Sequence, residues 1–145
     1  MRRRHSAHAP PSPLADALAR VGDRWTLLVV AALLDGEKRF NELQEALDGI
    51  APNVLSGRLK LLGEQALVVS RAYSERPPRF VYELTERGRA LAGALRLLAD
   101  WGAATAGREE PLRHAACGGP VQARWWCASC GTVVDDPADD EIVHM

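Results

Sequence analysis

The chain has 145 residues, of which 47% are hydrophobic and 26% are charged, as in an ordinary soluble globular protein. Its net charge of −1 excludes a global electrostatic attraction to nucleic acid. The apolar run at residues 27–34 is too short to span a bilayer, and the basic N-terminus lacks the apolar stretch of a secretory signal. We therefore expect a cytoplasmic protein, made of one domain and an appendage, that does not enter membranes.

Residues 1–12 are predicted to form a disordered basic arm, which is either an inert tail or an arm that touches DNA. A first helix is predicted from residue 14 to residue 21, ending near Gly22. Asp23 stands where an N-cap is needed for the second helix, residues 24–34. This helix is apolar nearly all round, so it should form the buried centre of the domain. Residues 38–40 form a brief extended bridge, after which Asn41 is expected to cap a helix over residues 41–47.

A four-residue turn leads to a helix at residues 52–65, read as PNVLSGRLKLLGEQ. Leu55, Leu59 and Leu62 recur at helical spacing and make one apolar stripe. The opposite side carries polar residues that can contact phosphates and base edges in a major groove; we assign this role to Asn53, Ser56 and Lys60. Two helices joined by a short turn, with a polar outward face on the second, are typical of a helix-turn-helix.

Arg58 is a further candidate DNA contact in the same helix. It lies nearer the buried edge than Lys60 does, so it either touches DNA or pairs with an acidic neighbour. Ala51 stands at the N-cap position without a capping side chain, which costs about 1 kcal/mol unless Asn53 or water covers the free N–H groups.

Strand-forming residues follow at 68–73 and 80–84, and between them lies a loop tip with two prolines. Arg76 and Arg79 flank this tip. A cationic hairpin directly after a helix-turn-helix is a wing that can reach the DNA backbone or minor groove. The predicted fold is therefore mainly α with a β-hairpin wing (α+β), a winged helix-turn-helix domain over residues 13–108.

Thr85 should cap one long helix, residues 86–107. Leu91, Leu95, Leu98 and Trp101 lie along or beside one line of this helix. This apolar face is long for a small domain to cover. We predict that part of it forms a homodimer contact; packing on the chain's own first helix is the alternative, and both can hold.

Residues 12–105 resemble the HxlR-type winged helix-turn-helix transcriptional regulators of bacteria. The most specific matches are GDRWTLL, RFNEL, PNVLSGRLK and PPRFVYELTERG. The resemblance implies a dimeric, DNA-binding regulator of transcription. Many members sense electrophiles or oxidants through a cysteine before the first helix. Here that region reads Pro11-Ser12-Pro13, and no cysteine precedes Cys117, so thiol sensing at the usual place is excluded.

The tail, residues 111–145, contains His114-x-x-Cys117 and Cys127-x-x-Cys130. Two such pairs separated by a short connector are typical of a tetrahedral zinc site, each pair forming a tight knuckle. We predict a zinc-ribbon-like module holding one structural Zn²⁺ per chain. The alternatives are three reduced cysteines in a loose tail or a reversible Cys127–Cys130 disulfide. His144 could compete as a ligand but has no knuckle partner.

The leading functional hypothesis is a homodimer that binds double-stranded DNA at a pseudo-palindromic site. The rival is a winged helix adaptor that docks on other proteins through its ribbon. Enzymatic activity is not expected, because no catalytic pattern is evident and four protein ligands leave no open position on the zinc. The operator, the sign of regulation and a small-molecule or redox effector stay open.

Overall fold

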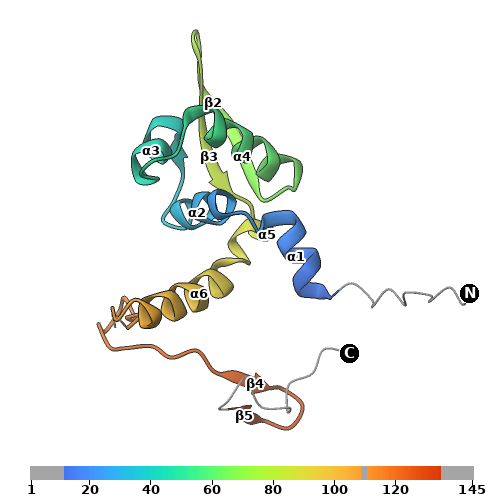
Figure 1. Ribbon diagram of the computed structural model, residues 1–145, viewed down its shortest axis with the longest axis vertical. Helices are drawn as coiled ribbons and strands as arrows, with labels where there is room; N and C mark the ends of the chain where they lie inside the picture. Colours follow the sequence, from blue (N-terminus) through green and yellow to red (C-terminus); the bar gives the residue numbers. More distant parts are fainter. Residues whose placement is uncertain (1–11, 109–110, 135–145) are drawn as a thin grey trace, which may run out of the picture. The chain divides into compact units, whose positions relative to one another are not determined.

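The computed structural model describes residues 12–108 and 111–134 (Figure 1). The predicted basic arm lies, except for Ser12, outside the described residues, and so does His144. The chain divides into two compact units, Met1–Leu95 and Arg96–Met145. No helix of the described part is long and apolar enough to cross a membrane.

Four helices open the first unit: α1 Pro13–Val21, α2 Arg24–Leu33, α3 Phe40–Ala46 and α4 Pro52–Glu64. Each begins for a local reason. The Ser12 hydroxyl accepts from the Ala15 N–H of α1, the Asp23 carboxylate accepts from the Trp25 and Thr26 N–H groups of α2, and Pro52 occupies the first turn of α4. As predicted, Ala51 caps α4 without a side-chain hydrogen bond.

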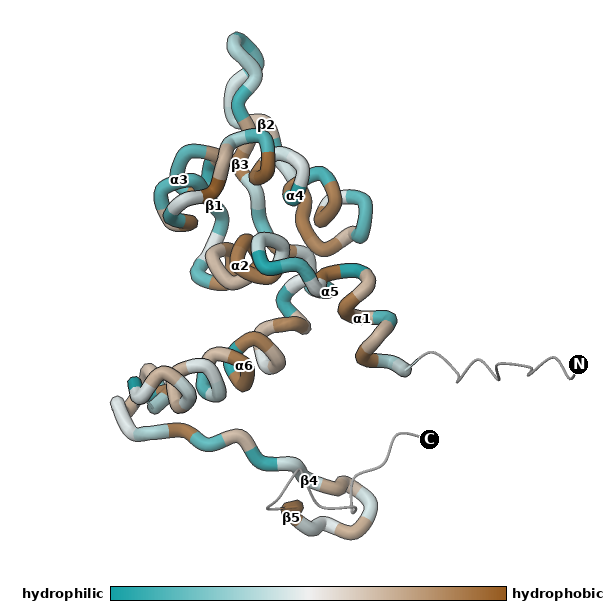
Figure 2. The backbone as a smooth tube through the Cα atoms, in the orientation of Figure 1, coloured by the Kyte–Doolittle hydropathy of each residue, from teal (hydrophilic) through white to brown (hydrophobic). Residues whose placement is uncertain are grey.

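The core of this unit is built from α2, α3 and α4. Val29, Val30, Leu43, Leu55 and Leu62 are fully buried, and Figure 2 shows α2 as hydrophobic along most of its length. The predicted central helix and the apolar stripe of α4 are thereby confirmed. The stripe fixes which side of α4 turns away from the core.

A three-stranded antiparallel sheet completes the winged fold, with β1 Lys38–Arg39, β2 Val68–Glu75 and β3 Pro78–Leu84 in the order β1-β3-β2. The β2–β3 hairpin projects beyond α3 and α4, and its tip is hydrophilic (Figures 1 and 2). The predicted loop at 74–79 is shorter than expected. Ser74 pairs with Arg79 and Glu75 with Pro78, which is the first residue of β3 and lies outside the part of that strand that pairs with β1.

Two predicted helix boundaries are wrong. Asn41 does not cap α3, which starts at Phe40: the Arg39 N–H donates to Glu42 Oε2 at 2.6 Å, so that Arg39 is the N-cap. The long helix at 86–107 is divided into α5 Glu86–Arg89 and α6 Ala92–Thr105. Gly88 packs so closely that a Cβ there would lie 2.2 Å from the Leu67 carbonyl oxygen. This tertiary contact holds α5 against the sheet, while Thr85 caps it as predicted.

The second unit contains most of α6 and a short antiparallel ribbon, β4 Trp125–Cys127 and β5 Thr132–Val134. Val121 lies outside any strand, but its N–H donates to the Leu112 carbonyl at 2.8 Å, and Arg113 and Pro120 form an isolated bridge. The tail thus consists of two small hairpins.

Candidate nucleic-acid interface

The outward side of α4 carries the residues predicted to contact DNA. Asn53, Ser56 and Lys60 are all exposed, because the buried stripe of Leu55, Leu59 and Leu62 turns the opposite side of the helix to solvent. Among the described residues, Lys60 has one carboxylate nearby: Nζ lies 4.0 Å from Glu64 Oε1. An ion pair this exposed contributes little to the stability of the helix, and it leaves the Lys60 ammonium available to a phosphate.

Gly57 lies on the same outward side, between Asn53 and Lys60 in sequence. Nothing lies within 4 Å of the place where its Cβ would be. The fold therefore has no steric need for glycine here, although glycine in a helix interior costs about 1 kcal/mol relative to alanine. The missing side chain leaves the backbone of α4 open to close approach from outside.

Arg58 is engaged inside the unit. Its Nε is buried and lies 3.1 Å from Asp23 Oδ1. The contact is an ion pair without hydrogen-bond geometry, and it joins the N-terminus of α2 to the middle of α4. Of the two roles expected for Arg58, pairing with an acidic neighbour is the one that the contacts favour.

Asp23 carries three contacts at once. Its carboxylate caps α2, accepts a hydrogen bond from the Thr26 hydroxyl and faces Arg58. Partial burial alone would raise the pKa of Asp23. The hydrogen bonds from Thr26, the Arg58 charge and the Trp25 N–H outweigh that effect and hold the pKa below its usual value. The charged carboxylate is therefore the form that stabilises the junction of α2 and α4.

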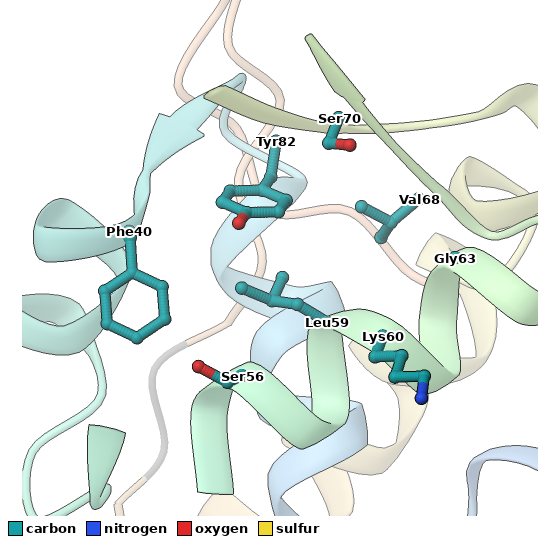
Figure 3. Close-up of a pocket in the computed structure, with 8 residues that line it drawn as sticks. All are labelled: Phe40, Ser56, Leu59, Lys60, Gly63, Val68, Ser70 and Tyr82. Atoms are coloured by element: carbon teal, nitrogen blue, oxygen red, sulfur yellow. The ribbon is translucent and has the colours of Figure 1, made fainter. Parts of the chain in front are cut away.

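A pocket of about 310 Å³ separates α4 from the sheet (Figure 3). α4 contributes Ser56, Leu59, Lys60 and Gly63 to its lining, and the sheet contributes Val68, Ser70 and Tyr82. Phe40 lines the side nearest α3. Burial raises the pKa of the Tyr82 phenol, so this hydroxyl stays neutral at pH 7. Ser56 and Lys60 thus border the hollow between the helix and the wing.

The wing carries cations of two kinds. Arg71 Nη2 lies 2.9 Å from Glu37 Oε2, so its charge is neutralised within the unit. Arg76 and Arg79 are exposed, and neither forms an ion pair within the described residues. The two arginines predicted from the hairpin sequence are therefore the ones available to an external anion.

The predicted dimer face is partly covered by the chain itself. Leu91 and Leu95 pack against the core of the first unit, whereas Leu98 and Trp101 are 53% and 68% exposed. Leu14 and Leu18 of α1 are exposed as well. Their helical spacing makes an apolar face on α1, to which the sequence alone gives no function.

The predicted zinc ligands are exposed and lie in pairs. His114 Nδ1 is 3.4 Å from Cys117 Sγ, and Cys127 and Cys130 bracket the tip between β4 and β5. Hydrogen bonds from the side chains of Thr132 and Cys127 lower the pKa of the Cys130 thiol. Within residues 12–108 and 111–134, no three His, Cys, Asp or Glu side chains converge as a metal site. The structure therefore forms each pair but does not bring the two pairs together.

Comparisons with known proteins give a consistent result. The family model for the HxlR-like helix-turn-helix matches residues 20–110. The chain is 41% identical over 119 residues to the HTH-type transcriptional regulator Rv3095 of Mycobacterium tuberculosis, covering 79% of this chain and 75% of that protein.

Two solved structures share the fold. The reduced form of the redox regulator HypR aligns with a TM-score of 0.62 and 30% identity, covering 66% of this chain and 94% of that one. A putative HTH-type transcriptional regulator, ytcD, aligns with a TM-score of 0.62 and 32% identity, covering 67% and 99%. The family match over residues 20–110 takes in the elements from α2 to α6.

We predict that Asp23→Asn lowers the free energy of unfolding at pH 7, because asparagine still caps α2 but gives Arg58 no charged partner. The effect should be below about 1 kcal/mol, since both side chains are partly solvated. The lowered pKa of Asp23 means that its stabilisation is complete above the usual value of 3.8 and is lost as the pH falls through the folded-state value. Urea unfolding should therefore show a larger deficit at pH 7 than at pH 3.

The matched control for this substitution is Asp35→Asn, which removes an exposed carboxylate after the other end of α2. Its stability should not show the same pH-dependent loss. A deficit for Asp23→Asn that is equal at the two pH values would contradict the role of the charge.

Proposed function

The chain belongs to the HxlR-like helix-turn-helix family of transcriptional regulators, and on that premise we propose that it binds a pseudo-palindromic DNA site as a homodimer. The observation that carries the proposal is the exposed polar side of α4 beside a wing with two exposed arginines that form no ion pair within residues 12–108 and 111–134. This surface offers groove-reading and phosphate-binding groups together. The adaptor hypothesis would require an acidic or apolar face here, and the described residues give it no support.

Each candidate contact has a role that follows from its chemistry. Asn53, in the first turn of α4, can bond an adenine edge in two places, and Ser56 can bond either a base or a phosphate. Lys60 is a flexible point charge suited to phosphate. Gly57 allows the backbone of α4 to approach the groove. Arg58 has a different role, because its pairing with Asp23 links the middle of α4 to the N-terminus of α2.

The wing would extend the contact along the duplex. Arg76 lies in the two-residue turn that joins β2 to β3, and Arg79 is the second residue of β3. Arginines at such a tip suit the backbone or the narrow minor groove that flanks the reading helix. The duplex would then be held at two places by each subunit.

We propose that the apolar side chains left exposed by α6, Leu98 and Trp101, form the dimer contact. Exposed leucine and tryptophan on one helix of a small protein indicate an interaction surface. A two-fold dimer would place the two copies of α4 in successive major grooves, about 34 Å apart. HypR is by name a redox regulator; in this chain, any thiol response would have to use the cysteines at 117–130.

We predict that Lys60→Ala weakens binding to all duplexes, whereas Asn53→Ala changes which duplexes are preferred. The loss of one phosphate contact should reduce the slope of log K against log salt by about 0.9. The loss of a bidentate base contact should reduce discrimination at one position by about 1–3 kcal/mol. The measurement is titration of duplexes selected from a genomic fragment pool at several salt concentrations.

Arg96→Ala is the control for both substitutions, because it removes an exposed cation from α6. It should leave the salt slope and the preferred sequences unchanged. If Lys60→Ala and Asn53→Ala both bind like the parent chain at moderate salt, α4 is not the reading helix.

We predict that the double substitution Arg76→Ala and Arg79→Ala lowers affinity more for long duplexes than for duplexes trimmed to the two half-site cores. The wing contacts would lie outside those cores, and their removal should also flatten the salt dependence. Arg71→Ala is the matched control on the same hairpin, because Glu37 already neutralises Arg71. An unchanged salt slope in the double variant would show that the wing does not touch DNA.

We predict that Leu98→Glu converts dimers into monomers, because it places a charge in the proposed contact. Leu98 is a cleaner test than Leu95, whose side chain packs on the core of its own chain. Arg96→Glu introduces the same charge on the same helix and should leave the dimer intact. The measurement is sedimentation velocity at micromolar concentration, and a parent chain that is already monomeric there would overturn the dimer proposal.

A further inference from the structure

The two hairpins of the tail end in the same kind of turn. In the first, the Gly118 N–H donates to the His114 carbonyl at 2.8 Å. In the second, the Gly131 N–H donates to the Cys127 carbonyl at 2.9 Å. Gly118 and Gly131 have φ values of 70° and 69°, a left-handed conformation that favours glycine. Two segments with different sequences thus adopt one turn geometry, at the two places where x-x pairs of His and Cys occur.

This turn brings the two members of each pair, which are three residues apart in sequence, to one tip. His114 Nδ1 and Cys117 Sγ are 3.4 Å apart. Two ligands of one tetrahedral zinc, with Zn–N near 2.0–2.1 Å and Zn–S near 2.3 Å, would be about 3.5 Å apart. The first pair is therefore spaced as two ligands of one ion require.

The hairpins have no core that could stabilise them. No residue of the described stretch 111–134 is buried, and Trp125, Trp126 and Val121 are all exposed. Two short strands without a buried face are marginal in water. Segments of this size usually depend on a disulfide, a metal or a partner for stability.

We propose that His114, Cys117, Cys127 and Cys130 bind one Zn²⁺ per chain and that the ion joins the two hairpins into one ribbon. Three thiolates and one imidazole suit zinc and disfavour magnesium or calcium. Each pair is formed within its own hairpin. Coordination of the ion, rather than burial of apolar side chains, would bring the two pairs together. Four protein ligands fill the tetrahedron, so the site is structural and has no open position for a substrate.

The connection between the hairpins fits this arrangement. Residues 122–124 link them without regular structure, so the second hairpin is free to bring its pair to the first. Binding converts the cysteine thiols to thiolates and releases their protons to solvent, which makes the affinity fall at acidic pH.

The test uses the full chain, purified without an affinity tag. Elemental analysis should give one zinc per chain, and X-ray absorption should give three sulfurs near 2.3 Å and one nitrogen near 2.0–2.1 Å. His114→Ala and Cys127→Ser should lose the stoichiometric zinc. His144→Ala is the matched control and should keep it.

Hydrogen exchange separates the module from the rest of the chain. Chelation of the parent protein should speed exchange at residues 111–134 and leave α2, α4 and the wing protected. These readouts do not involve DNA, so their failure would leave the proposed function standing. Absence of zinc together with three freely reactive thiols would overturn the proposal. A fast-forming Cys127–Cys130 disulfide in zinc-free protein would also overturn it, in favour of a redox site.

Discussion

The carboxylate of Asp23 is the constraint on which the proposed DNA-reading surface depends. Asp23 lies in the connection between α1 and α2, and its carboxylate caps the N-terminus of α2 and faces Arg58 on α4. Apolar packing of Leu55 and Leu62 presses α4 on the core, but leucine contacts alone tolerate some rotation about the helix axis. The ion pair of Arg58 with Asp23 adds a directional restraint, because rotation of α4 would carry the guanidinium away from the carboxylate. Its own contribution is small, since both side chains are partly solvated. The leucine packing and the Arg58–Asp23 pair, on the inner side of α4, therefore determine the direction in which Asn53 and Lys60 point.

Sequence reasoning succeeded where the determining interaction is local. The N-caps Asp23 and Thr85, the proline in the first turn of α4 and its apolar stripe all act within one turn of helix. It failed where a distant contact decided the outcome. The helix at 86–107 is periodic throughout, yet the chain leaves the helix at Ala90 and Leu91. Gly88, just before this break, packs closely on Leu67, and that contact could not be anticipated from the sequence. Asn41 is a residue type that often caps helices. The Arg39 N–H instead donates to the Glu42 carboxylate, so the helix begins one residue earlier, with Arg39 as its N-cap.

The same division holds for the candidate site. Exposure of Asn53, Ser56 and Lys60 follows from helical geometry once the apolar stripe is known. The partner of Arg58 could not be read from the sequence, because Asp23 lies in another helix. The apolar line on α6 was visible, but the point where self-packing ends, between Leu95 and Leu98, depends on how α5 docks. The pairing of His114 with Cys117 was predicted because a knuckle is local. The convergence of both pairs is a long-range property that no local turn determines.

In the proposed function, Gly57 would match α4 to the duplex rather than to the helix's own stability. A helix with glycine at an exposed central position unfolds more readily than one with alanine, and nothing inside the unit requires the smaller residue. If the backbone at Gly57 contacts the wall of the groove, α4 is less stable in the free chain and is stabilised when the duplex binds. The helix would then be more rigid on its operator than in solution. DNA sites would differ in affinity partly because they stabilise α4 to different degrees.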